Sequence, residues 1–123
     1  MGEGTKKLVL MVTHGPEQPE LATVPLVMAT TALASDIDVL VGFQGNGVFL
    51  AMKGMAERVS AHGFPPIRDL VKSYVDAGGK MYVCAPCAAS RMMKQEDLIE
   101  GAEIVGGATF VAECAAATNV LVY

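Results

Sequence analysis

The chain has 123 residues, of which 52% are hydrophobic and only 18% are charged, and its formal net charge is −4 at pH 7. A compact domain of ~100–150 residues usually carries about 25% charge, so this chain is unusually apolar for its length. The composition excludes a disordered chain, which needs low hydrophobicity and high charge. The acidic balance, without a basic patch, argues against direct nucleic-acid binding.

A membrane span is not expected either. The longest apolar stretch, residues 21–34, is interrupted by threonines and a proline, and it is shorter than the ~20 apolar residues that a span needs. The first apolar run follows two lysines and is typical of a buried strand rather than a signal peptide, so we expect a cytoplasmic protein. Because a small domain buries only about two-thirds of the surface of its unfolded chain, we expect some of the apolar excess at a subunit interface.

Five apolar segments are predicted to be strands, at residues 6–13, 37–43, 80–83, 102–105 and 119–123. Helices are predicted between them, at residues 19–35, 48–59, 67–77, 84–93 and 107–118, with one helical turn within 95–101. Pro25 is predicted to kink the first helix or to delay its start. Apolar strands that alternate with helices indicate a parallel sheet covered on both faces. The predicted fold is one α/β domain over residues 1–123, a three-layer α/β/α arrangement with a mainly parallel five-stranded sheet and an open strand order.

The strongest candidate for chemistry is Cys84, which directly follows the third predicted strand. Loops after parallel strands gather at one edge of the sheet, where ligands bind. The residues after Cys84 are predicted to form a helix, with Pro86 suited to its first turn. Backbone N–H groups at a helix start carry partial positive charge and stabilise a thiolate, the nucleophilic form of cysteine. Arg91 can add positive charge or hold an anion, so we predict a reactive thiol at Cys84.

Cys87 lies three residues after Cys84, and this spacing is open to three interpretations. A zinc site needs four ligands, and Cys114 with two distant histidines completes one poorly, so no metal is expected. A dithiol–disulfide exchanger uses the same spacing. In the third interpretation Cys84 carries sulfur as a persulfide, and Cys87 is an auxiliary thiol that resolves the persulfide as a disulfide.

Residues 42–47 form a glycine-rich loop after the second predicted strand. The loop matches neither GxGxxG nor a Walker loop, so a nucleotide site is not indicated. Its backbone N–H groups, together with Gln44, Gly45 and Asn46, are predicted to line a small anion pocket. His14, after the first strand, is predicted to be a proton shuttle or a wall of that pocket, with an ordinary loop histidine as the alternative.

Other chemically notable side chains receive a structural interpretation. Cys114 is expected to pack in the core, and His62 is expected at the surface. The apolar side chains near the reactive edge are expected to form the subunit interface; they are Phe49, Met52, Met55, Met92 and Met93.

Several segments together resemble the DsrE/DsrF-like sulfur-relay family. They are Val83-Cys84 with a small-residue helix reaching Arg91, residues 96–104, and residues 120–123. The strand at residues 8–13, the strand and loop at 38–47 and the helix start at 64–66 are similar too. The resemblance implies a five-stranded α/β/α fold that assembles into trimers or hexamers. It also implies that the cysteine after the third strand, Cys84 by position, accepts sulfur as a persulfide and passes it to a partner. Cys87 is an addition to the family pattern, and Met92 stands where many members have glycine.

These observations lead to the hypothesis of a sulfur carrier or sulfurtransferase-like protein that forms a persulfide on Cys84. Its partners would be sulfur donor and acceptor proteins or small sulfane-sulfur compounds, and it would form a homotrimer or homohexamer without a cofactor. Two alternatives stay open. One is a dithiol–disulfide oxidoreductase that uses Cys84 and Cys87, and the other is a non-catalytic module that binds a small ligand or a partner.

Overall fold

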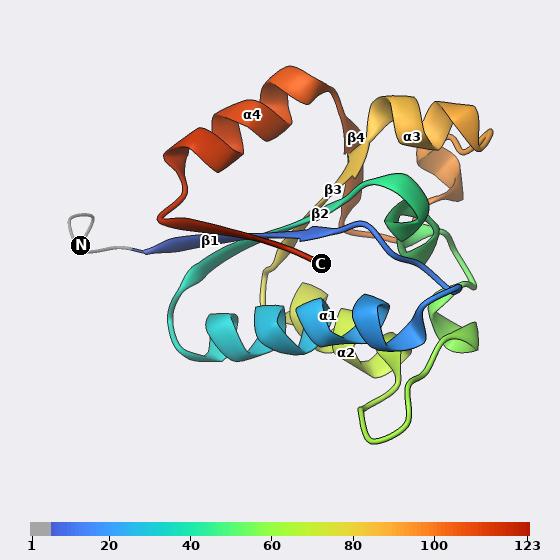
Figure 1. The fold of residues 1–123 in the computed structure, drawn as a ribbon, viewed down its shortest axis with the longest axis horizontal. Coiled ribbons are helices and arrows are strands. Elements are labelled where there is room, and N and C mark those ends of the chain that lie inside the picture. Colours follow the sequence, from blue (N-terminus) through green and yellow to red (C-terminus); the bar gives the residue numbers. More distant parts are fainter. Residues whose placement is uncertain (1–5) are drawn as a thin grey trace.

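A single parallel sheet lies at the centre of the computed structural model, which describes residues 6–123 (Figure 1). Residues 1–5, part of the segment that argued against a signal peptide, lie outside the described residues. The strands are β1 (Lys7–Val12), β2 (Asp38–Phe43), β3 (Lys80–Cys84), β4 (Ala102–Val105) and β5 (Asn119–Val122). Their order is β4-β3-β2-β1-β5, and each neighbouring pair is parallel. The α/β fold class is therefore confirmed, and the strand order that the sequence left open is settled.

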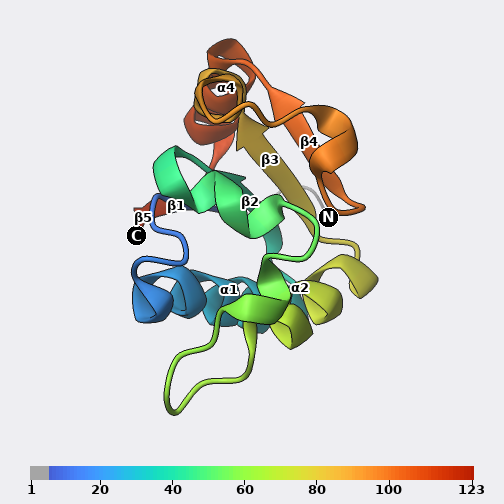
Figure 2. The same cartoon turned by 90° about the vertical axis from the view of Figure 1, so that its right-hand side faces the viewer.

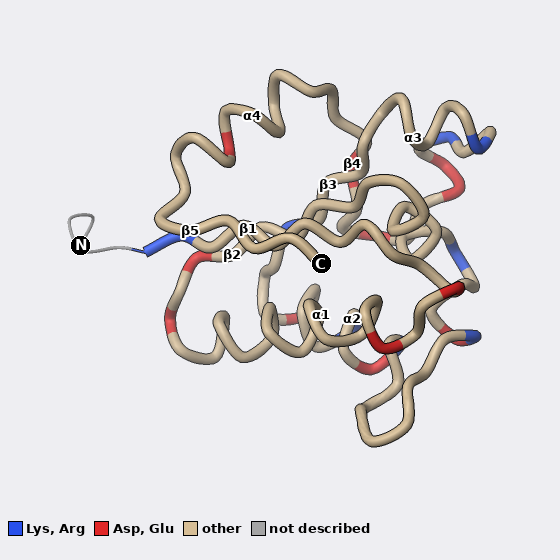
Figure 3. Tube along the Cα trace, in the orientation of Figure 1, with Lys and Arg blue, Asp and Glu red and all other residues tan. Residues whose placement is uncertain are grey.

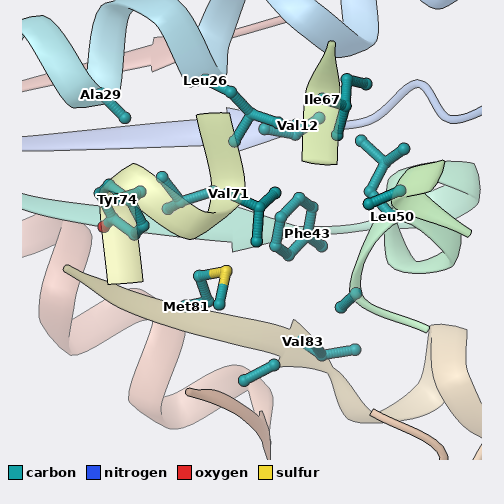
Figure 4. Packing of buried hydrophobic residues seen from close by; sticks show 14 of the residues in the cluster. Val12, Leu26, Ala29, Phe43, Leu50, Ile67, Val71, Tyr74, Met81 and Val83 are labelled. Carbon is teal, nitrogen blue, oxygen red and sulfur yellow. The ribbon is translucent and has the colours of Figure 1, made fainter. Parts of the chain in front are cut away.

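One face of the sheet is covered by α1 (Pro19–Ala34) and α2 (Ile67–Asp76) (Figures 1 and 2). α1 begins at Pro19, where a missing N–H costs nothing, and continues through Pro25, so the delayed start is wrong. Leu26 and Ala29 of α1, Ile67 of α2 and Phe43 of β2 point into one continuous core (Figure 4). We call this side of the sheet the closed face.

The opposite face is covered by α4 (Gly107–Ala116). Its buried cluster has far fewer side chains than the core beneath α1 and α2. The four residues buried in this cluster are Val9, Met11, Leu40 and Phe110. Phe110 lies over Gly42 of β2, where an added Cβ would come within 2.6 Å of the Phe110 ring. The ring also meets Tyr82 edge to face, with centroids 6.2 Å apart. We call this side the open face.

α4 and α1 each carry a single charged residue, and Figure 3 shows both almost without charge. On α4 the charge is Glu113, which forms an ion pair with Lys7 at the start of β1. Apart from this ion pair, several apolar side chains are exposed here. They are Val111 of α4 and the β5 residues Val120 and Val122, and Val122 is 67% exposed. The open face therefore leaves apolar surface uncovered along the β5 edge.

Two of the predicted helices differ from those in the structure. Residues 48–59 do not form an α-helix but two short 3-10 segments, η1 (Gly45–Ala51) and η2 (Ala56–Arg58). Met52 ends η1 because it takes an extended conformation and forms an antiparallel bridge with Leu98. α3 (Ala85–Ser90) stops before Met93 because Met92 adopts a left-handed backbone with φ +59°. The predicted turn within 95–101 is confirmed as η3 (Gln95–Asp97).

The five apolar residues predicted to form the subunit interface differ in their exposure within the single chain. Met93 is buried at 6% exposure, while Phe49, Met52 and Met55 are partly buried against the closed-face core. Met92 alone of the five is fully exposed, at 88%. Uncovered apolar side chains thus lie on the open face, on the outer side of α1 at Leu21 and Met28, and beside α3 at Met92. Within residues 6–123, no helix combines the length and the apolar character that a membrane crossing requires.

Candidate functional site

Two neighbouring strands bring the candidate residues together at the carboxyl edge of the sheet. β2 and β3 are paired, with Phe43 opposite Val83, so the segments that follow them leave the sheet side by side. β3 ends at Cys84, which is the N-cap residue of α3. β2 is followed by Gln44 and η1, and Figure 1 shows η1 and α3 at the same end of the molecule. As predicted, the segment that contains Cys84 and the glycine-rich loop lie at the same edge of the sheet.

A backbone hydrogen bond joins the loop to the second cysteine. The N–H of Gly45 donates to Sγ of Cys87 at 3.3 Å. Gly45 has φ +53°, a left-handed conformation that glycine adopts without the steric cost paid by other residues. The loop geometry therefore places a fixed donor against Cys87.

Arg91 forms the second link between α3 and η1. Its Nη2 donates to Oδ1 of Asn46 at 2.9 Å, and its Nη1 donates to the Cys87 carbonyl at 3.1 Å. Nη1 also lies 3.3 Å from Oγ of Ser90, and the guanidinium carbon lies 5.7 Å from the centroid of the Phe49 ring. A guanidinium over an aromatic face within about 6 Å is attracted to it. Arg91 is therefore held beside the cysteine pair rather than free in solvent.

The two thiols have opposite acid–base character. Burial raises the pKa of the Cys84 thiol, and its hydrogen bond to the Cys87 sulfur raises it further, against the lowering effects of the Cys87 N–H and Arg91. Burial also acts to raise the pKa of Cys87, but hydrogen bonds from Cys84 and from the Gly45 N–H, together with the Arg91 charge, bring it below its ordinary value. The arrangement favours one negative charge, held on Cys87, with Cys84 as the thiol that donates to it. α3 has only six residues, so the specific contacts carry more of this effect than the helix dipole does.

The other two predicted site residues, His14 and Gln44, have no described contact with the cysteine pair. Nδ1 of His14 is 3.3 Å from Oγ1 of Thr13, and no contact between His14 and either sulfur is among those described. Gln44 lines an open groove of about 450 Å³ on the open face, together with Phe110 and Cys114. The structure thus unites Cys84, Cys87, Gly45, Asn46 and Arg91, while Gln44 faces the groove and His14 stays at the neighbouring loop.

Three further residues bear on the sequence interpretation. Cys114 is half-buried and packs against the Phe110 cluster, in keeping with the expected packing role, although it also lines the groove. His62 is exposed, as expected. Phe49, expected at an interface, contacts Arg91 within the chain. This contact joins residues far apart in the chain, so no local pattern could have indicated it.

Among residues 6–123 no cluster of three or more histidine, cysteine or acidic side chains has an arrangement able to hold a metal ion. All three cysteines are free thiols. The chemistry that this set of residues supports is sulfur chemistry at a thiol pair, one member of which is stabilised as a thiolate.

Comparison with known sequences identifies related proteins. The sequence model of the DsrE/DsrF-like family matches residues 6–123. The chain is 34% identical over 105 residues to the uncharacterized protein MJ0760 of Methanocaldococcus jannaschii, covering 85% of this chain but only 38% of that protein. It is 32% identical over 117 residues to the uncharacterized protein MJ0989 of the same organism, covering 95% of this chain and 99% of that protein. The chain thus spans well under half of one relative and nearly all of the other.

Solved structures share the fold. The YchN protein of E. coli superimposes with a TM-score of 0.82 at 18% identity, covering 97% of this chain and all of that chain. A protein of unknown function from Methanobacterium thermoautotrophicum, MTH1491, superimposes with a TM-score of 0.69 at 15% identity, covering 93% of this chain and 96% of that chain. At these identities the likeness concerns the fold alone.

Proposed function

This chain belongs to the DsrE/DsrF-like family, which is generally associated with sulfur relay, and we propose that it carries a sulfane sulfur as a persulfide on Cys84. The observation that carries the proposal is the thiol pair at the carboxyl edge of the sheet. Its single negative charge is supported by the Gly45 N–H and by Arg91. A thiolate is the nucleophilic form of cysteine, so such a pair is suited to accept sulfur from a donor.

The overall chemistry is the transfer of one sulfur atom without net oxidation or reduction. A cysteine thiolate attacks the outer sulfur of a donor persulfide, a new S–S bond forms, and the donor leaves as a thiolate. An acceptor thiolate then attacks the outer sulfur on the protein and restores the cysteine thiolate. In this proposal the Gly45 N–H and Arg91, which Asn46 anchors, stabilise the negative charge, while Gln44 and His14 form the outer walls of the site.

A second candidate function is dithiol–disulfide exchange. It is favoured by the Cys-x-x-Cys spacing, which places two free thiols at the start of α3, since neighbouring thiols can be oxidised to a disulfide. A redox titration separates the two functions. Reversible formation of a Cys84–Cys87 disulfide near cellular potentials, without accumulation of a persulfide, supports the exchanger.

We also propose that the chain forms a homotrimer or homohexamer through the open face. The occupant that fits this surface is a second copy of the chain. Val111, Val120 and Val122 expose apolar side chains there, and Glu113 is the single charge on α4. A subunit packed on this face would remove from water the apolar surface that one α-helix leaves uncovered.

The proposed carrier function is tested by mass spectrometry after incubation with a small-molecule persulfide and rapid alkylation. Trypsin releases both candidate cysteines on the peptide of residues 81–91, so fragment ions must assign the added sulfur atom to one of them. Cys114 lies on the peptide of residues 95–123 and is an internal control. We expect the added sulfur on Cys84 and none on Cys114. A protein that gains no sulfur on Cys84 from any donor contradicts the proposal.

A further inference from the structure

We infer that the two cysteines act in a fixed order, in which sulfur first reaches Cys87 and then moves to Cys84. This inference rests on the proposed carrier function and assigns a role to each thiol. It makes Cys87 the attacking sulfur, a catalytic residue rather than an accessory one. It makes Cys84 the position at which sulfur comes to rest before delivery.

The contacts of the two sulfurs differ in kind. Among the described contacts, only Cys87 receives a backbone N–H from outside its own helix, the Gly45 bond of 3.3 Å. Cys84 occupies the N-cap of α3 without a side-chain capping hydrogen bond, and the one N–H that lowers its pKa, that of Cys87, belongs to α3 itself. The donor that stabilises a thiolate is therefore placed against Cys87, and η1 holds it there through the left-handed backbone of Gly45.

Positive charge is also built into the Cys87 side of the pair. Arg91 binds the Cys87 carbonyl and is tied to η1 by Asn46 and by the Phe49 ring. These anchors fix the guanidinium, so its charge acts on the thiol pair continuously instead of moving away with a mobile side chain. In agreement with this geometry, the pKa of Cys87 is lowered while that of Cys84 is raised.

The two thiols also pack against different sides of the sheet. Cys87 contacts the core of the closed face, whereas Cys84 contacts the Phe110 cluster of the open face. Movement of sulfur from Cys87 to Cys84 therefore carries it from the η1 side toward the open face, on which the 450 Å³ groove lies.

The first step transfers sulfur to Cys87. The Cys87 thiolate attacks the outer sulfur of a donor persulfide, R–S–SH. The bond between Cys87 and this sulfur forms while the S–S bond of the donor breaks. The donor leaves as R–S⁻ with the electron pair and takes the thiol proton of Cys84. The result is a Cys87 persulfide beside a Cys84 thiolate.

The second step transfers sulfur to Cys84. The Cys84 thiolate attacks the outer sulfur on Cys87, the new S–S bond forms at Cys84, and the bond to Cys87 breaks. Cys87 leaves as the thiolate that the Gly45 N–H and Arg91 stabilise. A thiol of lower pKa is the better leaving group, so the contacts that make Cys87 a good nucleophile also favour passage of sulfur to Cys84. Neither step needs an external oxidant or reductant.

The test compares the loading rates of Cys84→Ser and Cys87→Ser in rapid-quench reactions with a small-molecule persulfide at pH 7. We expect Cys84→Ser to load at a rate close to that of the unaltered protein, with the sulfur trapped on Cys87, since serine retains a hydrogen-bond donor. We expect Cys87→Ser to load Cys84 several-fold more slowly, because this variant lacks the sulfur that the Gly45 N–H stabilises as a thiolate. Loading of Cys87→Ser at the unaltered rate overturns the order, yet leaves the carrier function intact. Absence of loading in all three proteins overturns the carrier function itself.

A second measurement tests the charge on Cys87 and does not depend on turnover. In the Cys84→Ser background, the rate of Cys87 alkylation is followed against pH with and without Asn46→Ala, which removes the hydrogen bond between Arg91 and η1 and leaves only the Phe49 contact. We expect the midpoint of the profile to rise in Asn46→Ala. Ser90→Ala is the matched control, because it removes the 3.3 Å contact with Arg91 and the Ser90 hydrogen bond to the Cys87 carbonyl but keeps the Asn46 anchor, and we expect it to move the midpoint less. Equal midpoints in Asn46→Ala and its parent overturn the role of the anchored Arg91, and circular dichroism spectra verify that each variant is folded.

Discussion

The closed and open faces of the sheet bury apolar side chains to very different extents. On the closed face, α1 and α2 cover a continuous core that includes the fully buried Phe43 and Tyr74. On the open face, α4 covers a small cluster centred on Phe110, and Val122 stays exposed on β5. Parallel sheets are normally covered on both faces. The difference shows that the closed face supplies most of the buried core, whereas the open face leaves apolar side chains exposed.

The cysteine pair lies where these two faces meet. Cys87 packs against the closed-face core and Cys84 against the open-face cluster. The closed face supplies the rigid background that keeps Gly45 and Arg91 in place. The open face supplies the surface from which a partner could reach Cys84. Variants on either side therefore test the comparison, and they are considered from the largest expected effect to the smallest.

The largest effect is expected for Phe43→Ala on the closed face. Phe43 is completely buried, and phenylalanine-to-alanine changes in a core usually cost about 3–5 kcal/mol because they leave a cavity. The matched change on the other face is Phe110→Ala, which should cost less, about 1–3 kcal/mol, because its surroundings already open onto a groove and can admit water. Urea denaturation of both variants measures the difference. Equal losses of unfolding free energy would contradict the distinction between the faces.

A smaller effect, with a pH signature, is expected for Tyr74→Phe. The Tyr74 hydroxyl donates to the Lys80 carbonyl at 2.6 Å, and removing a hydrogen bond of this kind costs about 0.5–1.5 kcal/mol. Burial raises the pKa of Tyr74, so the folded protein keeps a proton that the unfolded chain loses near pH ~10. Because the folded state then binds more protons, this group lowers stability as the pH rises above ~10.

The measurement for Tyr74 is urea denaturation of the unaltered protein and of Tyr74→Phe at pH 9 and at pH 11. We expect the stability deficit of the variant to shrink at the higher pH, because the variant lacks the alkaline loss due to Tyr74. A deficit that stays constant, or that grows with pH, would show that the hydroxyl is not protected by burial.

The smallest effect on stability is expected for Val122→Thr on the open face. Val122 is largely exposed, so the change should alter the unfolding free energy by less than about 0.5 kcal/mol. If the open face binds a second copy of the chain, the same change weakens association. Met92→Gln is the matched control, because Met92 is even more exposed and lies next to α3, and glutamine adds no branched Cβ at its left-handed backbone. If light scattering shows weaker association for Met92→Gln than for Val122→Thr, the interface lies at the methionines predicted from the sequence.

The apolar periodicity of the sequence predicted much of the fold. Five apolar runs located all five strands, and their alternation with helices predicted parallel pairing. The order of the strands could not be predicted, since the pairing of β1 with both β2 and β5 depends on long-range packing. The segment after Gln44 was predicted as an α-helix from the spacing of Phe49, Met52 and Met55. It forms 3-10 turns instead, because Met52 pairs with Leu98.

The position of the candidate site could also be predicted, but the acid–base roles within it could not. Cys84 and the glycine-rich loop each follow a predicted strand, and loops after parallel strands gather at one edge of the sheet. The lower pKa of Cys87 depends on the Gly45 N–H and on an Arg91 held by Asn46 and Phe49. These contacts join residues distant in the chain and depend on the three-dimensional packing of η1 against α3.

The central claim, that the cysteine pair takes up sulfur and gives it up again, is tested most directly by a pulse and chase with a radioactive sulfur label. The unaltered protein is loaded from a small-molecule persulfide labelled at its outer sulfur, freed of donor, and then mixed with an acceptor thiol. We expect one label per chain after loading and its recovery on the acceptor as a persulfide, with no loading of a variant that lacks both Cys84 and Cys87. A protein that takes up no label, or that holds it against every acceptor thiol, would contradict the account.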